Sequence, residues 1–328
     1  MGYALVRFEF RGGPGVWGLL MDATVAPFPK HFDTLRDLLR EDWRGLLGRV
    51  RARGAGTIPA NEVRFLSPVT QEAQVLCQGK NYLAHLKETG VRPENKEFNL
   101  IFTKASSALA PPEGVLPRPS RVKLLDYELE LGLVLARDVT EPVRVTEENL
   151  GEFVAGVVMA NDVSARDVQV PERQWFKGKS FRGFCPVGPV LWLFEPGEAL
   201  SLHDLNLELR VNGEVRQKAS TRQLLHRPEE TLTELSEIVD LRCGDLLLTG
   251  TPGGVAMRIR KTLWSRLRGK FLEEHEKMVL FLEEQAGNPR YLRDGDVIES
   301  TIRSADGGID LGRQRLVVCG PARCSSLP

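Results

Sequence analysis

The stretch DYELELGLVL, residues 126–135, alternates acidic and apolar side chains in its first half. In the two-residue period of a β-strand, one face is therefore apolar and the other begins with three carboxylates. The apolar set is Tyr127, Leu129, Leu131, Leu133 and Leu135, and the acidic set is Asp126, Glu128 and Glu130. Acidic side chains are uncommon in strands, and neighbouring like charges repel. The pattern predicts either a solvent-facing edge strand or carboxylates gathered around a cation.

Short apolar segments separated by Gly and Pro turns follow from about residue 67 onward. We expect strands in residues 101–104, 153–162, 186–193, 205–213, 244–252, 295–302 and 311–320, and a loop in residues 111–120. Strands outnumber helices and no strand–helix–strand alternation persists. This order predicts an α+β fold that is mainly β, rather than a doubly wound parallel sheet.

Two segments differ from the strand-rich region in their pattern of apolar residues. Residues 1–66 predict a small N-terminal α/β domain, with a hairpin from residues 3–10 and 16–21 and an amphipathic helix over residues 34–50. Residues 67–328 form the predicted catalytic domain. A helical insertion is expected at about residues 258–288, where apolar residues recur at helical spacing: Trp264, Leu267, Phe271, Met278 and Leu282.

Composition narrows the classes of partner and compartment. The chain carries 44 basic and 44 acidic residues, so no overall field favours nucleic acid or an anionic membrane, and we expect small molecules as partners. Five cysteines without a C-x-x-C pair predict reduced thiols that serve packing. The first residues, MGYALVRFEFRGG, lack the basic and apolar regions of a signal peptide, and no apolar run approaches the roughly 20 residues that span a bilayer. We therefore expect a cytoplasmic protein.

A second stretch, GVVMANDVSARDVQ, supports the cation interpretation of the acidic strand. Its apolar part ends at Asn161 and Asp162. A carboxylate at this strand end, beside a strand that carries Glu128 and Glu130, would complete an all-oxygen site for Mg²⁺ or Mn²⁺. The alternative is that Asp162 caps the N-terminus of a helix that begins with SARDVQ.

Several ordered motifs together resemble the fumarylacetoacetate hydrolase family. They are ELE (128–130), NDVSARDVQ (161–169), KSF (179–181), VNGEVRQ (211–217) and GDLLLTGTPGGV (244–255). The resemblance runs from about residue 76 to residue 320, with the helical insertion as its main gap. It implies a β-rich roll of mixed sheets, a homodimer, and one Mg²⁺ or Mn²⁺ per subunit held by Glu128, Glu130 and Asp162.

The segment GKNYLAHLKETG, residues 79–90, reads as a short helix with His85 and Glu88 three residues apart on one face. On its own such a pair indicates an ordinary surface contact. The resemblance implies instead a catalytic dyad on a lid, in which the carboxylate raises the basicity of the imidazole for attack by water.

Lys179 lies in KGKSF, whose GKS also ends the phosphate-binding loop G-x-x-x-x-G-K-[ST]. The first glycine of that loop would have to stand at position 173, which is Arg173, so a phosphate-binding loop is excluded. The resemblance places this lysine beside the metal, where it can stabilise enolate charge.

Four more residues are predicted to bind substrate. Arg166 and Gln169 would share a helix face and orient a substrate carboxylate, although an ion pair of Arg166 with an acidic residue is an alternative. The resemblance adds Lys104 and Thr251. Asp126 would either support the residues that bind the metal, without contacting the metal itself, or be exposed to solvent.

We expect a divalent-metal-dependent catabolic hydrolase that cleaves a carbon–carbon bond in a 2,4-dioxo acid, such as an acylpyruvate or a fumarylacetoacetate-like compound. A 2-oxo-4-enoate hydratase, an oxaloacetate-type decarboxylase or an isomerase could use the same metal–enolate site. An alternative of another class is a catalytically silent metal-binding or ligand-binding homologue. Departures from the family pattern are Ala256 and Met257 after GGV, Arg182 after KSF, and the insertion. These departures affect the prediction of the substrate more than the prediction of the fold.

Overall fold

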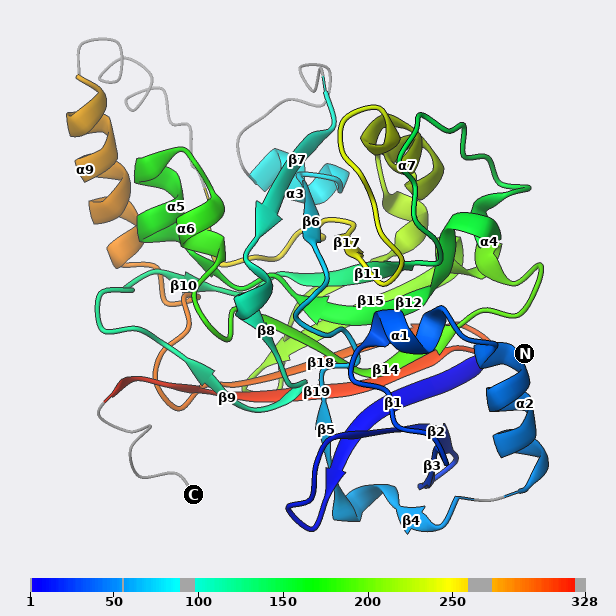
Figure 1. Ribbon diagram of the computed structural model, residues 1–328. Coiled ribbons are helices and arrows are strands. Elements are labelled where there is room, and N and C mark those ends of the chain that lie inside the picture. The colour runs from blue at the N-terminus through cyan, green and yellow to red at the C-terminus, as the bar shows by residue number, and fades with distance from the viewer. Residues whose placement is uncertain (1, 55, 89–97, 259–272, 322–328) are drawn as a thin grey trace.

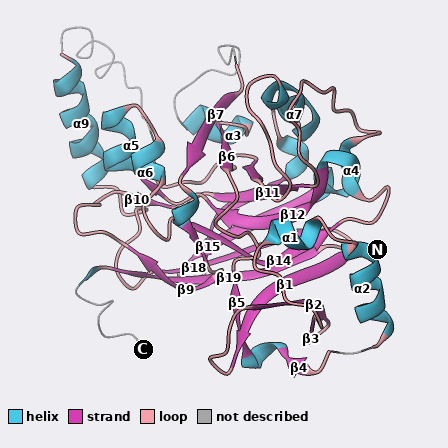
Figure 2. Cartoon of the chain, in the orientation of Figure 1, coloured by secondary structure: helices cyan, strands magenta, loops and turns pink. Residues whose placement is uncertain are grey.

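The computed structural model describes residues 2–54, 56–88, 98–258 and 273–321 and is built mainly of strands (Figures 1 and 2). The larger sheet contains, in spatial order, β4 (Ile58–Pro59), β3 (Thr24–Pro27), β2 (Val16–Met21), β1 (Tyr3–Phe10), β14 (Cys185–Leu193), β12 (Val154–Asn161), β11 (Leu129–Leu135), β17 (Leu246–Leu248), β6 (Val75–Gly79) and β7 (Leu100–Lys104). Two further strands join it, β5 (Val63–Leu66) on β1 and β8 (Leu109–Ala110) on β14. The pairs β17·β6 and β14·β8 are parallel, so the sheet is mixed.

A second sheet lies against the first. Its order is β16 (Glu214–Ser220), β15 (Leu205–Val211), β18 (Val297–Ser304), β19 (Asp310–Cys319) and β9 (Glu113–Pro117). A two-stranded ladder joins β10 (Leu125–Asp126) to β13 (Ser164–Ala165). The mainly β, α+β prediction is confirmed. The predicted loop over residues 111–120 is wrong where β9 forms, because β9 pairs in parallel with β19, a partner far away in the chain.

The helices are short and lie around the sheets. They are α1 (Leu35–Leu39), α2 (Trp43–Ala52), α3 (Leu83–Glu88), α4 (Leu150–Phe153), α5 (Arg166–Glu172), α6 (Phe176–Lys179), α7 (Pro228–Ser236) and α9 (Glu274–Ala286). Single turns of 3-10 helix occur at Ala60–Glu62, Ser106–Ala108 and Thr221–Gln223, and a longer one at Ala199–Asp204. In Figure 1, α5 and α6 lie together near β10, and α3 lies beside β6 and β7.

The apolar face of β11 is part of the core between the two sheets. Leu129, Leu131, Leu133 and Leu135 all belong to a cluster that includes residues of β15, β18 and β19. Val134 faces the other way and joins a second cluster, formed with α1 and α2. The predicted alternation is confirmed, but both faces of β11 are buried, so the edge-strand alternative is wrong.

The helix predicted over residues 34–50 is two helices. Thr34 caps α1, its hydroxyl accepting from the backbone of Asp37 while the Asp37 carboxylate accepts from the backbone of Thr34. Asp42 then caps α2 by accepting from the backbone N–H of Gly45. A second capping carboxylate in the middle of the segment restarts the helix, because it supplies the acceptor that a helix N-terminus needs.

The N-terminal strands are hydrogen-bonded to the rest of the fold. β1 pairs with β14, so residues 3–10 extend the same sheet that carries β11 and β12. The division into domains at residues 1–66 and 67–328 stays a prediction. Of the predicted insertion, α9 is a helix whose Phe281 and Leu282 pack on the core. Trp264, Leu267 and Phe271 lie outside the described residues.

The described cysteines agree with the prediction of thiols that serve packing. Cys77, Cys185, Cys243 and Cys319 are free and buried, and Cys324 lies outside the described residues. In the part of the chain that the structure describes, no helix combines the length and the apolar character needed to cross a membrane.

Candidate active site and metal centre

Antiparallel pairing of β11 with β12 brings three carboxylates together. Glu130 stands opposite Ala160 in the register, and the backbone N–H of Asp162, just past the end of β12, donates to the carbonyl oxygen of Glu128 at 2.7 Å. Residues 128, 130 and 162 therefore share the sheet face opposite the leucine core. One carboxylate oxygen of each lies within 4.8 Å of those of the other two. The structure thus gathers the predicted metal ligands; their binding of a metal stays a prediction.

Asp162 is not the cap of a helix. Helix α5 begins at Arg166, its N-cap position is Ala165, and no side chain caps it. The intervening residues pair as β13 with β10. The helix-cap alternative is therefore wrong, and the Asp162 side chain is directed to the carboxylate cluster.

Buried cations surround two of the three carboxylates. Lys179 Nζ lies 2.5 Å from Glu128 Oε2 and also contacts Asp162 Oδ2. Lys104 Nζ lies 2.6 Å from Asp162 Oδ1, and Arg166 Nη2 donates to Glu128 Oε1. Glu130 differs, since within the described residues it takes part in no ion pair. Its Oε2 accepts from the backbone N–H of Gly250 at 2.8 Å.

The surroundings separate the proton affinities of the two glutamates. Burial alone would raise the pKa of Glu128, but the charges of Arg166 and Lys179 hold that pKa well below its ordinary value. Burial raises the pKa of Glu130 well above its ordinary value, and the neighbouring Asp162 and Glu128 carboxylates raise it further. Glu130 is thus the member of the cluster whose ionised form lacks compensation.

The charge and the donor atoms of this cluster fit a divalent cation. Four buried carboxylates, those of Asp126, Glu128, Glu130 and Asp162, meet three buried cations, those of Lys104, Arg166 and Lys179. One negative charge remains, and it falls on Glu130. The donors are oxygens only, the set that Mg²⁺ and Mn²⁺ prefer, and no sulfur or imidazole ligand joins them in the described part.

Asp126, the third acidic residue of the opening stretch, holds the site together from behind. It is fully buried and accepts from Arg166 Nε at 2.9 Å. It also accepts from the backbone N–H groups of Ala256 at 2.8 Å and Met257 at 3.1 Å. Asp126 therefore fixes both the arginine and the loop that leads into the insertion.

Arg166 forms ion pairs with carboxylates of the protein, which was the alternative to a substrate contact in the sequence analysis. Its guanidinium contacts Asp126 and Glu128, and Nη1 donates to Gln169 Oε1 at 2.8 Å. These contacts hold the pKa of the guanidinium above its ordinary value despite burial. Arg166 and Gln169 nevertheless line a cavity next to the carboxylate cluster.

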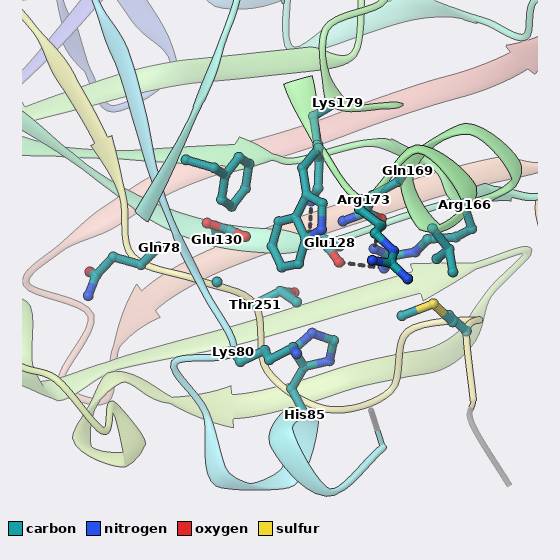
Figure 3. Close-up of a pocket in the computed structure, with 15 residues that line it drawn as sticks. Gln78, Lys80, His85, Glu128, Glu130, Arg166, Gln169, Arg173, Lys179 and Thr251 are labelled. Atoms are coloured by element: carbon teal, nitrogen blue, oxygen red, sulfur yellow. Dashed lines mark hydrogen bonds and ion pairs between the residues drawn. The ribbon is translucent and has the colours of Figure 1, made fainter. Parts of the chain in front are cut away.

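This cavity, of about 270 Å³, opens beside the cluster (Figure 3). Among the predicted site residues, those on its wall are Glu128, Glu130, His85, Lys179, Arg166, Gln169 and Thr251. Three predicted residues do not reach the wall: Asp162, Lys104, which contacts Asp162, and Glu88, which points to the backbone of Gly254. The volume lies at the lower end of the roughly 300–1,000 Å³ range of ligand pockets, which suits a small acid.

The predicted dyad is present but open. His85 and Glu88 share one face of α3, with 3.8 Å between His85 Nδ1 and Glu88 Oε2. His85 Nδ1 is buried and finds no hydrogen-bond partner among the described residues. Both oxygens of Glu88 lie 3.0 Å from the backbone nitrogen of Gly254, which donates to them. Glu88 therefore anchors the loop after β17 more directly than it orients the imidazole.

Thr251 closes the side of the cavity next to β11. Its hydroxyl donates to the carbonyl oxygen of Leu129 at 3.0 Å and accepts from Gln217 Nε2 at 2.8 Å. Because its proton and one of its two lone pairs are used within the protein, Thr251 shapes the wall more than it offers a substrate contact.

Eight wall residues were not predicted as site residues: Gln78, Gly79, Lys80, Phe102, Val170, Arg173, Trp175 and Met257. The sequence feature that could have marked Lys80 as a site residue is its position in GKNY, five residues before His85. Arg173 entered the sequence analysis only as the residue that excludes a phosphate-binding loop. Of the departures from the family pattern, Met257 lies on the wall, whereas Arg182 is exposed and does not line the cavity.

Comparison with known proteins identifies the family of the chain. A family model described as fumarylacetoacetate (FAA) hydrolase C-terminal matches residues 74–318. The chain is 39% identical over 202 residues to the mitochondrial oxaloacetate tautomerase Fahd2a of Rattus norvegicus, which covers 61% of this chain and 62% of the relative. The chain therefore matches less than two thirds of the length of that relative.

Two solved structures extend the likeness over nearly the whole chain. The fumarylacetoacetate hydrolase from psychrophilic Exiguobacterium antarcticum is 31% identical, with a TM-score of 0.73, covering 97% of this chain and 99% of that one. A probable 2-hydroxyhepta-2,4-diene-1,7-dioate isomerase from Mycobacterium abscessus is 29% identical, with a TM-score of 0.70, covering 97% and 98%. The matched proteins thus include a hydrolase, an isomerase and a tautomerase.

Proposed function

The chain belongs to the fumarylacetoacetate hydrolase family, and from this premise we propose that it is an enzyme that interconverts the enol and keto forms of a 2-oxo acid at a divalent cation. The observation that carries the proposal is the position of His85. Its imidazole lines the same cavity as Glu128 and Glu130, and its Nδ1 has no partner in the described part of the chain. A buried imidazole beside a cluster of carboxylates that can hold a cation can accept and return one proton.

The cation would be Mg²⁺ or Mn²⁺, held by Glu128, Glu130 and Asp162. When bound there, it would polarise the oxygens of the 2-oxo acid and stabilise negative charge as it develops on them.

The residues of the chain supply the rest of the reaction. In the enol-to-keto direction the proton on the oxygen at carbon 2 leaves, and carbon 3 gains a proton. His85 would take or deliver this proton, and Lys179 would stabilise the charge on the oxygen at carbon 2. Figure 3 shows His85 on α3 and Lys179 on α6 approaching the cavity from opposite sides. Arg166 would support this arrangement by holding Glu128 in place.

Tautomerisation is favoured over hydrolysis by the open dyad. Enol–keto exchange needs one proton carrier, whereas hydrolysis needs a base strong enough to activate water. The separation of 3.8 Å between His85 Nδ1 and Glu88 Oε2 leaves the imidazole without carboxylate support. The similarity to the rat oxaloacetate tautomerase supports the same choice.

The test is to load the protein with Mn²⁺ and follow the ultraviolet absorbance of the enol form of oxaloacetate as it converts to the keto form. We expect acceleration over buffer with Mn²⁺, and a loss of about 100-fold or more in kcat for His85→Ala. His31→Ala, at an exposed histidine paired with Asp33, should leave the rate unchanged. A rate for His85→Ala equal to that of the unsubstituted protein would refute the assignment.

A second candidate is hydrolysis of a carbon–carbon bond in a 2,4-dioxo acid. It is favoured by the presence of Glu88 on the same face of α3 as His85, with 3.8 Å between His85 Nδ1 and Glu88 Oε2. Release of a carboxylic acid and a pyruvate-type ketone from an acylpyruvate, together with loss of that activity in Glu88→Gln, would identify this reaction.

We still expect the protein to be a homodimer and to be cytoplasmic, although the rat relative is named as mitochondrial.

A further inference from the structure

The wall of the cavity has an apolar part as well as an ionic one. Four large apolar residues from different segments line it: Phe102 of β7, Val170 of α5, Trp175 just before α6, and Met257 in the loop after β17. We call these four residues the apolar wall. Met257 is 7% exposed, and the other three are partly exposed. A cavity that joins a charged region to an apolar one suits a ligand with the same division.

The aromatic part of the apolar wall begins directly beside the buried cations. The rings of Phe102 and Trp175 lie edge to face, with 5.0 Å between their centroids and 68° between their planes. Lys179 Nζ lies 5.1 Å from the centroid of the Phe102 ring, within the range of a cation–π interaction. The same ammonium group contacts Glu128 and Asp162. A ligand held at the carboxylate cluster therefore has aromatic side chains as near neighbours.

Gly79, the last residue of β6, makes room for the Trp175 ring. A Cβ atom at position 79 would lie 2.8 Å from Trp175 Cζ3, 3.2 Å from its Cη2, and 2.5 Å from Leu100 Cδ2. All three distances are shorter than ordinary contact between carbon atoms. Gly79 is not among the glycines with positive φ, so the backbone conformation does not require glycine there. The requirement comes from the indole, which packs against the strand where a side chain is missing.

The cations on the wall are engaged within the protein. Arg166 and Lys179 form ion pairs with the carboxylate cluster. Lys80 and Arg173 also line the cavity, and each of them interacts with other groups of the protein. Beyond the carboxylate cluster and His85, the groups that remain to contact the far end of a ligand are therefore mainly apolar.

We propose that the apolar wall is a subsite for an aromatic ring, so that the substrate is a 2-oxo acid with an aryl group on carbon 3. This inference rests on the proposed function, in which the 2-oxo carboxylate end lies at the carboxylate cluster. The aryl group then packs against Phe102 and Trp175 in an offset or edge-to-face arrangement. The reaction needs no further reactant, because the enol oxygen loses one proton and carbon 3 gains one. In the enol, the double bond between carbons 2 and 3 is conjugated with the ring, which gives a planar shape that flat side chains can contact.

Unreactive ligands test the subsite by binding alone. Oxamate carries the 2-oxo carboxylate group, and oxanilate, its N-phenyl derivative, adds a ring at the position of carbon 3. Calorimetric titration of the Mn²⁺-loaded protein should give a Kd for oxanilate about tenfold lower than that for oxamate, the effect of partly burying one phenyl ring. N-oxalylglycine, which carries a carboxylate in place of the ring, should bind more weakly than oxanilate. Tighter binding of N-oxalylglycine than of oxanilate would contradict the proposal.

Substitutions assign the preference for oxanilate to the apolar wall. Trp175→Ala should raise the Kd of oxanilate about tenfold and change that of oxamate by less than about twofold, whereas Trp175→Phe should retain most of the preference. Phe176→Ala is the matched control, because it removes the adjacent ring, which is 52% exposed and does not line the cavity. It should change neither Kd. The unchanged binding of oxamate also shows that each variant is folded and binds the metal.

The outcomes separate the subsite from the proposed function. Equal affinity of the unsubstituted protein for oxamate and oxanilate would overturn the subsite alone. Equal weakening of both ligands by Trp175→Ala, or an undiminished preference for oxanilate in that variant, would do the same. Failure of both ligands to bind with Mn²⁺ present would overturn the proposed function as well.

Discussion

The backbone N–H of Asp162 donates to the carbonyl oxygen of Glu128 at 2.7 Å, so one hydrogen bond just beyond the β11–β12 ladder fixes the spacing of two of the proposed metal ligands. The backbone N–H of Glu128 in turn donates to Asn161 Oδ1 at 3.0 Å. The backbone therefore orders these carboxylates before any ion is bound. A preordered set of ligands binds a cation without having to gather the side chains first.

Glu130→Gln should stabilise the metal-free protein and abolish its stabilisation by Mn²⁺. The substitution removes the one cluster charge that lacks an ion pair, while the amide oxygen can still accept from Gly250. We expect the Tm without metal to rise by a few degrees, and the Tm increase with excess Mn²⁺ to disappear. Differential scanning calorimetry with and without chelator measures both.

Glu128→Gln is the matched contrast to that substitution. It leaves Lys179 and Arg166 buried without their carboxylate, which costs about 3 kcal/mol or more of the free energy of unfolding. A Tm without metal that falls for Glu128→Gln and rises for Glu130→Gln is the expected pair of results. A change of the metal-free Tm in the same direction in both variants would show that the uncompensated charge does not lie on Glu130.

Metal affinity should rise with pH because Glu130 must lose a proton to bind. The pKa of Glu130 lies well above its ordinary value of 4.5 in the folded, metal-free protein. Its neutral form therefore contributes stability that is present below about pH 4.5 and is lost as the pH rises through the raised pKa. Mn²⁺ titrations by calorimetry in two buffers of different ionisation enthalpy should reveal proton release at a pH below that pKa. Binding without proton uptake or release at any pH would contradict this expectation.

Lys104→Met should weaken metal binding more than substrate binding. Lys104 contacts Asp162 and does not line the cavity, so its loss frees a buried carboxylate without removing a substrate contact. We expect the Kd for Mn²⁺ to rise about tenfold, because Lys104 orients the Asp162 carboxylate. The KM at saturating Mn²⁺ should stay within about threefold, since Lys104 makes no contact with the substrate. A large rise in KM at saturating metal would restore Lys104 to the substrate pocket.

Glu88→Gln should have a small effect on enol–keto conversion. Glu88 accepts from the backbone N–H of Gly254, and glutamine can keep that hydrogen bond through its amide oxygen. We expect kcat to fall by less than about tenfold, against about 100-fold or more for His85→Ala. Steady-state rates of the two variants at one pH and one Mn²⁺ concentration give the comparison; equal losses would favour the hydrolytic dyad.

The predicted elements were right where the pattern is local. The alternation of residues 126–135 and the apolar run ending at Asn161 depend on the strand period and on where that period stops. The helix predicted over residues 34–50 failed because periodicity does not register a second capping residue, Asp42, within an otherwise amphipathic segment. The strand β9 was missed because its partner β19 lies far along the chain.

The same division applies to the site. Glu128, Glu130 and Asp162 could be gathered from sequence because adjacent antiparallel strands place them on one face. Lys104 could not be positioned behind Asp162 in this way, because the contact joins residues 58 positions apart on strands that are not neighbours in the sheet. Nor could Arg173 be recognised as a wall residue, since its backbone leaves the helical path at that position.

By itself, then, the sequence determined which face of β11 is apolar and where β12 ends, and it predicted from these that three carboxylates meet. Those features follow from covalent spacing along the chain and from the exclusion of apolar side chains from water. The tertiary structure alone decided which cations neutralise that cluster, which carboxylate stays uncompensated, and which side chains reach the cavity. The reason is physical: each of these depends on distances between segments remote in the chain, and Coulomb and hydrogen-bond energies are set by those distances.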